Sequence, residues 1–400
     1  MTSDGEKVLG ALRATTERRA QAGLRRSLIA RGPDWDGLLD LASNDYLGLH
    51  ADPRVIAGAV AAAQEWGAGS TGSRLVTGTT KLHRRLEETL AGFTGAARAL
   101  VFSSGYLANL AVVTSLANAL GRDVLIVSDE LNHASLIDAC RLARGATVQV
   151  TPHRDVAAVR AVLKARPAGQ MALVVSEAVF SVNGAVAPVA DLHAAARECD
   201  AFLVLDEAHA LGVLGPGGRG VGYEAGIAGE PDVVRTVTLS KALGSQGGAV
   251  LGVPEVIDVI VETGRGFIFD TGLAPAAAGA ALAALGVLAD DPRLPGRALA
   301  ATGRLADSVS AAGLVPVPPS ASVLCVPLGT PERAVAARDA GARAGVLAGC
   351  FRPPSVPEGA ACLRLTGRAT LSERDFAIVS RAMGQIREHV GVDVTTAFRQ

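Results

Sequence analysis

Lysine is scarce in this chain of 400 residues, because only four of its 38 basic residues are lysine. Any chemistry that needs a primary amine therefore has four candidates. Lys7, Lys81 and Lys164 stand among polar and charged residues, which is typical of solvated side chains. Lys241 differs from them, because it follows the apolar run VVRTVTLS and precedes the small residues ALGSQGG.

Cysteine is also rare, and neither sign of charge is in excess. The five cysteines form no C-x-x-C pair, so we expect reduced thiols, no disulfide framework and no metal site. A formal net charge of −1 with no basic tract argues against a nucleic-acid partner, which would need many cationic contacts. The 49% of hydrophobic residues exclude a disordered chain.

Long, strongly apolar runs are missing as well. The longest uncharged stretch, 271–289, contains Pro275 and many alanines and glycines, so we interpret it as a buried helix and expect no membrane span. The first 20 residues carry charges throughout and lack the apolar core of a signal peptide. We therefore expect a cytoplasmic protein.

Short runs rich in valine and leucine alternate with segments of helical length between about residues 50 and 290. Such runs predict strands buried on both faces of a mostly parallel sheet; they lie at 99–102, 124–128, 172–176, 201–207 and 233–240. The pattern changes at about residue 291. We predict an N-terminal arm (1–45, a helix and an entry strand), a large α/β domain (46–290) and a smaller C-terminal α+β domain (291–400).

Polar residues follow several of these predicted strands. A lysine at the end of a buried strand is partly desolvated, which lowers its pKa and makes the Lys241 amine available for a Schiff base. Asp206 also ends a strand, and a buried acid needs a cation. In a pyridoxal phosphate (PLP) enzyme that cation is the ring nitrogen, and His209 is near enough in sequence to reach the phenolic oxygen.

The segment FSSGYLAN (102–109) predicts a strand, a turn and a helix N-terminus, which is an anion site suited to a phosphate. Thr238 and Ser240 could add hydroxyl groups to it. His133 follows another predicted strand, where it could stack on a cofactor ring. Ligands of open α/β sheets bind at this edge, so we expect these side chains to meet there.

The chain resembles the α-oxoamine synthases, a family of fold-type I PLP enzymes. The resemblance covers some 350 residues; it is carried by LASNDYLGL (41–49), GAGSTGSRLVTGTTKLHRRLE (67–87), FSSGYLAN, HASLIDACRL (133–142), VFSVNGAVAPV (179–189), DEAHALGVLGPGGRG (206–220), TLSKALGSQGG (238–248) and FRPPSVPEG (351–359). It implies a large domain with a seven-stranded, mostly parallel sheet between helices, and a homodimer with shared active sites.

The resemblance also implies a role for individual residues. Lys241 matches the Schiff-base lysine, which also moves the substrate α-proton, and His133, Asp206 and Lys241 are the expected catalytic residues. The expected cofactor contacts are Gly105, Tyr106, His133, Ser181, Asp206, His209, Thr238, Lys241 and, from the second subunit, Thr271. The expected substrate contacts are Arg25, Asn44, His133, Ser355 and Arg364; Ser355 stands where the family branch described next usually has threonine.

The segments GSRLVTG and DEAHALGVLG are most similar to the biotin-synthesis branch of this family. That branch condenses L-alanine with a pimeloyl thioester, carried by coenzyme A or by a carrier protein, with loss of CO2. Two alternatives stay open: a sister enzyme that uses glycine with acetyl-CoA or another acyl-CoA, and a non-catalytic scaffold subunit. A scaffold subunit should lack the Schiff-base lysine, whereas Lys241 is present.

Overall fold

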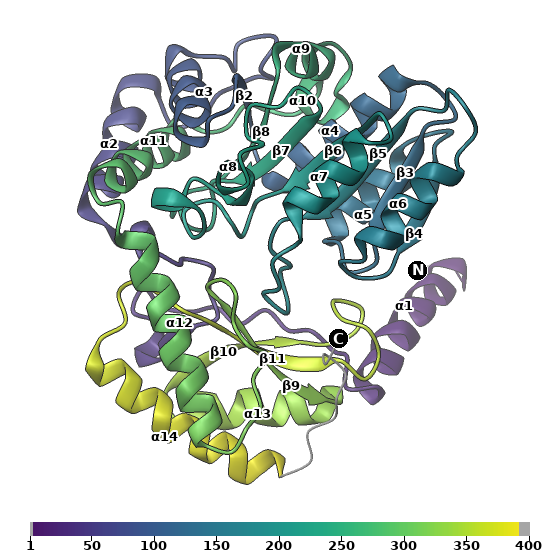
Figure 1. The fold of residues 1–400 in the computed structure, drawn as a ribbon. Coiled ribbons are helices and arrows are strands. Elements are labelled where there is room, and N and C mark those ends of the chain that lie inside the picture. Colours follow the sequence, from purple (N-terminus) through teal and green to yellow (C-terminus); the bar gives the residue numbers. More distant parts are fainter. Residues whose placement is uncertain (1–2, 392–400) are drawn as a thin grey trace.

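The computed structural model describes residues 3–391 and contains a seven-stranded and a four-stranded β-sheet, which lie one above the other in Figure 1. The seven-stranded sheet has the order β2-β8-β7-β6-β5-β3-β4. Its strands are β2 (Arg98–Phe102), β3 (Leu125–Asp129), β4 (Thr147–Thr151), β5 (Ala172–Glu177), β6 (Ala201–Asp206), β7 (Val233–Thr238) and β8 (Gly248–Gly252). Only β8 runs antiparallel to its neighbours, which confirms the predicted mostly parallel sheet.

Successive residues of the central strands enter two different hydrophobic cores. In β5, for example, Leu173 and Val175 pack with α4 and α5, whereas Ala172 and Val174 pack on the opposite side with α6 and α7. Side chains alternate between the faces of a strand, so a strand covered on both faces must be apolar at every position. Each such valine or leucine contributes about 1.5–3 kcal/mol by burial.

Helices cover both faces of this sheet. One face carries α4 (Gly105–Leu120), α5 (Ala134–Leu142), α9 (Pro254–Thr263) and α10 (Arg265–Ile268). The other core includes α2 (Pro53–Trp66), α3 (Lys81–Thr94), α6 (Val156–Ala165), α7 (Val189–Arg197), α8 (Val221–Glu224) and α11 (Pro275–Asp290). The uncharged stretch is indeed a largely buried helix, α11, and no helix within residues 3–391 has the length and apolarity to cross a bilayer.

The pattern of apolar runs does not predict two strands of the large sheet, β4 and β8. In β4, at the sheet edge, four of five residues are exposed, so its sequence does not need to be apolar. β8 begins and ends with glycine, and a Cβ on Gly248 would lie 2.5 Å from the backbone of Gly105. The close approach of these two chain segments therefore requires the glycine, which interrupts the strand-like pattern.

The smaller sheet has the order β1-β10-β11-β9 and is formed by β1 (Leu39–Leu41), β9 (Val323–Gly329), β10 (Val346–Phe351) and β11 (Ala361–Thr366). It packs with α12 (Leu294–Ala311), α13 (Pro331–Arg343) and α14 (Glu373–Val390). The entry strand of the N-terminal arm, β1, pairs in parallel with β10. The domain limits at residues 45 and 290 stay predictions; residues 392–400 of the predicted C-terminal domain lie outside the described residues.

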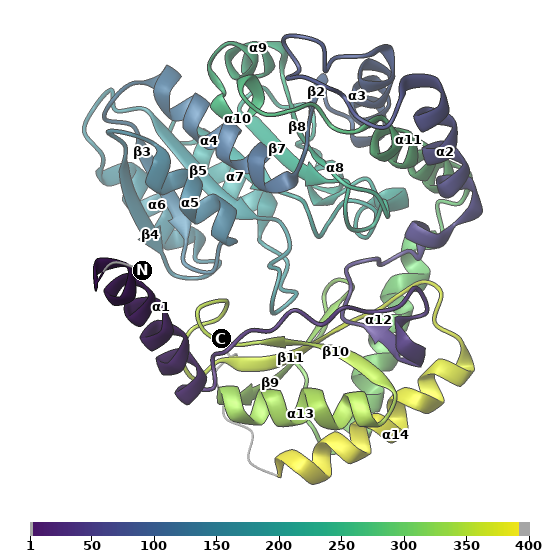
Figure 2. The same ribbon diagram turned by 180° about the vertical axis from the view of Figure 1, so that it is seen from behind.

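The first helix, α1 (Ser3–Gln21), lies at one side of the molecule in both Figure 1 and the view from behind in Figure 2. Its residues are mostly exposed, including Val8 and Leu12. The chain then runs along the smaller sheet to β1. The arm therefore contributes a strand to the fold, whereas its helix contributes no residue to the three hydrophobic cores.

Candidate active site

A cavity of about 260 Å³, here called the strand-end pocket, lies where β5, β6 and β7 end. Glu177, Asp206 and Thr238 terminate these three strands and line the pocket. All three belong to the face of the sheet that carries α4 and α5, because they follow Val175, Val204 and Val234 at even spacing. The position agrees with the general rule for ligand sites in open α/β sheets.

Six of the predicted site residues meet in the strand-end pocket: Gly105, Tyr106, His133, Asp206, Thr238 and Lys241. Lys241 follows β7, and burial lowers the pKa of its amine to about 8, although Asp206 opposes this shift. The predicted desolvated lysine is therefore present beside an acid. A pKa near 8 leaves a useful fraction of neutral, nucleophilic amine at neutral pH.

The carboxylate of Asp206 is held by two donors. Its Oδ2 accepts a hydrogen bond from Asn109 Nδ2 at 2.7 Å, and its Oδ1 accepts one from the Ala208 amide at 2.9 Å. Asn109 is fixed in turn, because its Oδ1 accepts a hydrogen bond from Thr236 Oγ1 at 2.6 Å. Both oxygens of this buried carboxyl group therefore have hydrogen-bond donors, which fix its orientation in the pocket.

His133 precedes α5 and acts as its N-terminal cap. Its Nδ1 accepts a hydrogen bond from the Ser135 amide at 3.2 Å and lies 2.7 Å from Ser135 Oγ. Burial lowers the pKa of His133, so its ring is neutral at neutral pH and carries its proton on Nε2. A neutral ring held in one orientation at the pocket wall suits stacking on a flat ligand.

His209 lies beside the strand-end pocket and pairs with Tyr46. The Tyr46 hydroxyl and His209 Nδ1 are 2.5 Å apart, and both side chains are buried. Burial, reinforced by the charge of Lys241, lowers the pKa of His209 well below its usual range. Burial raises the pKa of Tyr46. The pair is therefore a neutral hydrogen-bonding unit.

The start of α4 forms the other end of the pocket. Ser104 caps the helix by accepting a hydrogen bond from the Leu107 amide at 3.2 Å, and Gly105 begins the helix. Thr238 Oγ1 and Ser240 Oγ lie 2.7 Å apart in the same lining. Gly105 also packs closely on Thr238, since a Cβ on Gly105 would lie 3.3 Å from the Thr238 Cβ. Helix amides and hydroxyl groups together favour a phosphate.

Arg364 connects the smaller sheet to the large one. Its Nη1 donates to the Ser181 carbonyl at 3.0 Å and its Nη2 donates to Asn44 Oδ1 at 2.7 Å. The side chain is 95% buried, yet its Nε has no hydrogen-bond partner. Three predicted residues, Asn44, Ser181 and Arg364, thus meet beside the strand-end pocket rather than in its lining.

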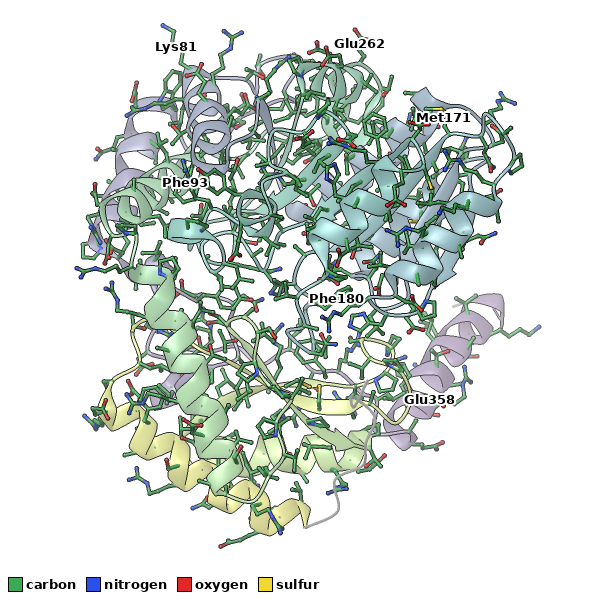
Figure 3. The ribbon with its side chains drawn as sticks, viewed as in Figure 1. Lys81, Phe93, Met171, Phe180, Glu262 and Glu358 are labelled. Atoms are coloured by element: carbon green, nitrogen blue, oxygen red, sulfur yellow. The ribbon has the colours of Figure 1, made fainter. Side chains whose placement is uncertain are left out.

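A second cavity of about 450 Å³, here called the loop cavity, is lined by residues 130–132, 137, 180, 182–183 and 353–358. Its lining is mainly apolar and includes Leu131, Ile137, Phe180, Val182, Val356 and the prolines at 353, 354 and 357, together with the predicted Ser355. Phe180, which follows β5 of the large sheet, and Glu358, from the loop between β10 and β11 of the smaller sheet, both line it (labelled in Figure 3). Asn132 lines this cavity, and the next residue in the chain, His133, lines the strand-end pocket.

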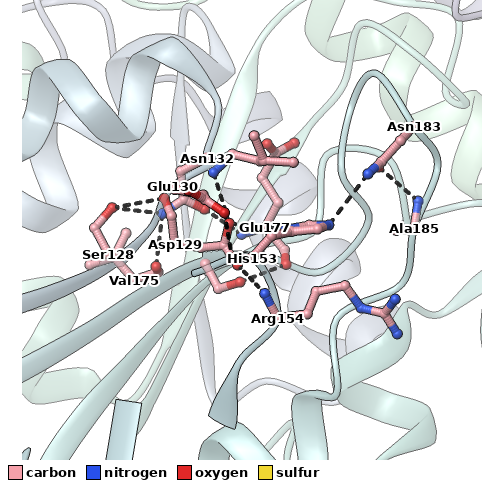
Figure 4. Close-up of polar contacts among 12 residues, drawn as sticks. Ser128, Asp129, Glu130, Asn132, His153, Arg154, Val175, Glu177, Asn183 and Ala185 are labelled. Carbon is pink, nitrogen blue, oxygen red and sulfur yellow. Dashed lines mark hydrogen bonds and ion pairs between the residues drawn. The ribbon is translucent and has the colours of Figure 1, made fainter. Parts of the chain in front are cut away.

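A polar network fixes the loop that carries Phe180 and Ser181 (Figure 4). Asp129 Oδ1 lies 3.1 Å from His153 Nδ1, and Asn183 Nδ2 lies 3.3 Å from His153 Nε2. His153 also packs edge-on against Phe180, with ring centroids 4.2 Å apart. The loop beside both cavities is therefore anchored to the end of β3.

The structure does not bring Arg25 or Thr271 into either cavity. Arg25 is exposed and touches Arg352 only through its backbone carbonyl, whereas its neighbour Arg26 donates to Ser355 Oγ at 3.3 Å. Thr271 is also exposed, and its backbone bridges to Ser73. The predicted roles of both residues stay predictions.

The chain is similar in sequence and in fold to known proteins. The family model described as aminotransferase class I and II matches residues 36–382. An 8-amino-7-oxononanoate synthase of Mycobacterium sp. (strain JLS) is 54% identical over all of both chains, and one from Mycolicibacterium paratuberculosis is 54% identical over 95% of this chain and 97% of its own. The chain belongs to the 8-amino-7-oxononanoate synthase family.

Solved structures agree with this family assignment. Serine palmitoyltransferase from Sphingomonas wittichii is 30% identical, covers 89% of this chain and 88% of its own, and has a TM-score of 0.83. A variant of the enzyme from S. paucimobilis, solved with a bound PLP–myriocin aldimine, is 27% identical over 96% of this chain and 98% of its own, with a TM-score of 0.87. The protein is a PLP-dependent enzyme of fold type I, as the resemblance predicted.

The residues of the strand-end pocket fit the cofactor of this family. PLP needs an amine for its aldehyde, an acid for its ring nitrogen and donors for its phosphate. The pocket offers the amine of Lys241 and the acid of Asp206, which Asn109 holds by a hydrogen bond. The first amides of α4 and the hydroxyl groups of Thr238 and Ser240 are the available phosphate donors.

Glu177, Asn109 and Tyr46 are among the residues of this site that the sequence-based prediction does not contain. Glu177 ends β5 as Asp206 ends β6, so its place directly after an apolar run was the signal that could have identified it. Asn109 and Tyr46 carried no comparable signal. They lie on α4 and just after β1, and only long-range contacts bring them to Asp206 and His209.

Proposed function

We propose that the protein condenses L-alanine with a pimeloyl thioester to form 8-amino-7-oxononanoate. The bond that forms joins the alanine α-carbon to the thioester carbonyl carbon. The C–S bond breaks and releases the thiol, and the bond to the alanine carboxylate breaks and releases CO2. The observation that carries this proposal is a partly desolvated lysine facing a hydrogen-bonded aspartate, next to a mainly apolar cavity.

Bound PLP supplies an electron sink for the negative charge that develops at the substrate α-carbon. In this proposal Lys241 would hold the cofactor through its amine and would later take the α-proton at Nζ. Asp206 would pair with the ring nitrogen, and His133 would stack on the ring. His209, whose Nδ1 lies 2.5 Å from the Tyr46 hydroxyl, would bind the phenolic oxygen. Gly105, Tyr106, Ser181 and Thr238 complete the cofactor contacts.

Arg364 is proposed to bind the alanine carboxylate, and Asn44 and Ser181 hold its guanidinium in place. A guanidinium presents paired N–H groups, which suits a carboxylate. The loop cavity is proposed to take the pimeloyl chain, with Ser355 at its rim and the N-terminal arm, through Arg25, close by. A cavity of about 450 Å³ lined mainly by apolar side chains supports a long acyl group over acetyl.

We further propose a cytoplasmic homodimer in which Thr271 of one subunit completes the phosphate site of its partner. Thr271 is exposed in a single chain, which leaves it available for such a contact. The cysteines support a reducing compartment, because within residues 3–391 all five thiols are free.

The test of this function compares substrate pairs with the PLP-loaded protein. Alanine with pimeloyl-CoA, and with a pimeloyl carrier protein, should give 8-amino-7-oxononanoate by mass spectrometry, with one CO2 released per product. Glycine with acetyl-CoA is the control for the sister activity. Faster turnover of glycine with acetyl-CoA would contradict the proposal, and so would a preparation that binds no PLP.

A further inference from the structure

Glu177 is a second buried acid in the strand-end pocket, and the proposed mechanism gives it no task. It ends β5, lines the pocket and is only 2% exposed. Its Oε1 has no hydrogen-bond partner. A buried carboxylate oxygen without a donor is costly when it carries charge, so the protonation state of this group needs an explanation.

The contrast with Asp206 is instructive, because the two acids are register partners on neighbouring parallel strands. Asp206 receives donors on both oxygens, from Asn109 Nδ2 at 2.7 Å and the Ala208 amide at 2.9 Å. Such donors stabilise an anion. The backbone amides of His133 and Ser181 act on the Glu177 carboxyl group, but its Oε1 has no donor. The two carboxyl groups are therefore unequally provided with hydrogen-bond donors.

The strand end that carries Glu177 is itself firmly held. Asn132 Oδ1 accepts a hydrogen bond from the Glu177 amide at 3.0 Å, and Asn132 Nδ2 donates to the Val175 carbonyl at 2.8 Å and to Ser128 Oγ at 3.0 Å (Figure 4). The free carboxyl oxygen is therefore not a consequence of a loose segment. It belongs to a residue whose backbone is fixed by a side-chain amide from the β3–α5 connection.

The charges around Glu177 come from several elements. Asp206 from β6, Lys241 after β7 and His133 before α5 face the same pocket, and Arg364 from β11 acts on Lys241. Burial raises the pKa of Glu177 well above its usual range, and Asp206 raises it further. Lys241 and the backbone amides of His133 and Ser181 oppose this rise, but burial is the largest influence. Because burial keeps His133 neutral, one lysine cation faces two acids. A buried site of this kind balances when one acid holds a proton.

We propose that Glu177 holds a proton in the folded enzyme, so that Asp206 is the one charged carboxylate of the strand-end pocket. Glu177 then acts as a positioning residue: it keeps a second negative charge away from the cofactor ring and offers an O–H donor in place of an acceptor. The inference rests on the proposed function for the identity of the cation that Asp206 meets. The protonation of Glu177 itself does not depend on that function.

The first test measures protonation directly by infrared difference spectroscopy on the PLP-loaded enzyme at neutral pH. Wild type minus Glu177→Gln should show the C=O stretch of one protonated carboxylic acid. Wild type minus Asp206→Asn, the matched control, should show the bands of an ionised carboxylate. A carboxylate signal in the Glu177→Gln difference would overturn the proposal.

The second test compares the affinity of the same variants for PLP, measured from its visible absorbance. Glu177→Gln replaces a neutral acid by a neutral amide and should weaken binding less than about threefold, whereas Asp206→Asn removes a charge and should weaken it by about tenfold or more. Glu177→Met is a second neutral variant in case the amide does not fit. An equal loss of PLP affinity in Glu177→Gln and Asp206→Asn would overturn the inference. An unchanged PLP affinity in Asp206→Asn would instead contradict the role proposed for Asp206.

Discussion

The strand-end pocket and the loop cavity are built from different kinds of structure. The pocket takes Glu177, Asp206 and Thr238 from the ends of neighbouring strands, which the sheet holds in register. The cavity takes Phe180 and Val182 from one loop and residues 353–358 from another, in a distant part of the chain. Rigid strand ends suit groups that must meet reacting atoms, whereas loops can vary in shape and set the choice of substrate.

A second comparison concerns two acids that are adjacent in sequence: Asp206, the last residue of β6, and Glu207, the residue after it. Asp206 points into the pocket, whereas Glu207 points to the opposite face and pairs with Arg235 Nη1 at 2.9 Å. Both partners of that ion pair are almost completely buried, and Glu207 also accepts a hydrogen bond from the Gly222 amide at 2.7 Å. One acid stabilises the fold and its neighbour is left to the site, because alternate residues of a strand face opposite ways.

The largest expected effect is the loss of the pocket amine. Lys241→Ala should reduce turnover by about 10²–10⁴-fold or more, because no other group in the lining can both hold PLP and move the α-proton. The measurement is product formation together with the visible absorbance of the protein after PLP is added. Lys164→Ala, at an exposed lysine, is the matched control and should behave as wild type. A Lys241→Ala protein with wild-type turnover would remove the basis for placing the chemistry in this pocket.

The second-largest expected effect follows from changing Arg364, the arginine that connects the two sheets. Arg364→Lys keeps a positive charge but loses the paired N–H groups that contact Ser181 and Asn44. We expect the KM for alanine to rise about 10–100-fold, or about 1.4–2.8 kcal/mol, with a smaller change in the KM for pimeloyl-CoA. Steady-state kinetics with each substrate varied in turn would check this. An equal rise in both KM values would argue against a specific carboxylate contact.

The pH dependence of cofactor capture tests the desolvation of the pocket. With the pKa of Lys241 lowered from 10.5 to about 8, the neutral amine increases with pH up to about 8 and is constant above it. The rate of PLP capture should therefore rise about tenfold per pH unit below 8 and then level off. Between pH 8 and 10.5 the unfolded chain still binds the Lys241 proton, whereas the folded protein has lost it. The contribution of this group to the free energy of unfolding therefore increases as pH rises through that range. Stopped-flow absorbance gives the capture rate; a midpoint near 10.5 would show a solvated lysine.

The smallest expected effect belongs to the loop cavity. Ser355→Thr adds one methyl group at the rim and restores the residue that the biotin-synthesis branch usually has there. If the methyl group packs against the acyl chain, it contributes up to about 0.8 kcal/mol, or a fall of about fourfold in the KM for pimeloyl-CoA. The affinity for PLP should not change, since Ser355 does not line the strand-end pocket. A change in PLP affinity instead would mean that the two cavities do not act separately.

The sequence by itself determined five strands of the large sheet and the reactive groups at their ends. Runs of four to eight mostly apolar residues predicted five strands, and polar residues at or shortly after their ends identified Lys241, Asp206 and His133. These features are local: strand burial requires apolar residues, and a polar residue after such a run stands at the sheet edge. Gly105 and Thr238 could be placed in the pocket for the same reason.

Only the tertiary structure decided which distant residues complete the site. Asn109 meets Asp206, Tyr46 meets His209, and Asn44 meets Arg364 across separations of 97, 163 and 320 residues. No periodicity or spacing encodes such pairs, because they depend on how β1 joins the smaller sheet and how α4 packs on the large one. The charge state of Glu177 is also decided at this level, since a carboxyl group responds to its burial and its neighbours.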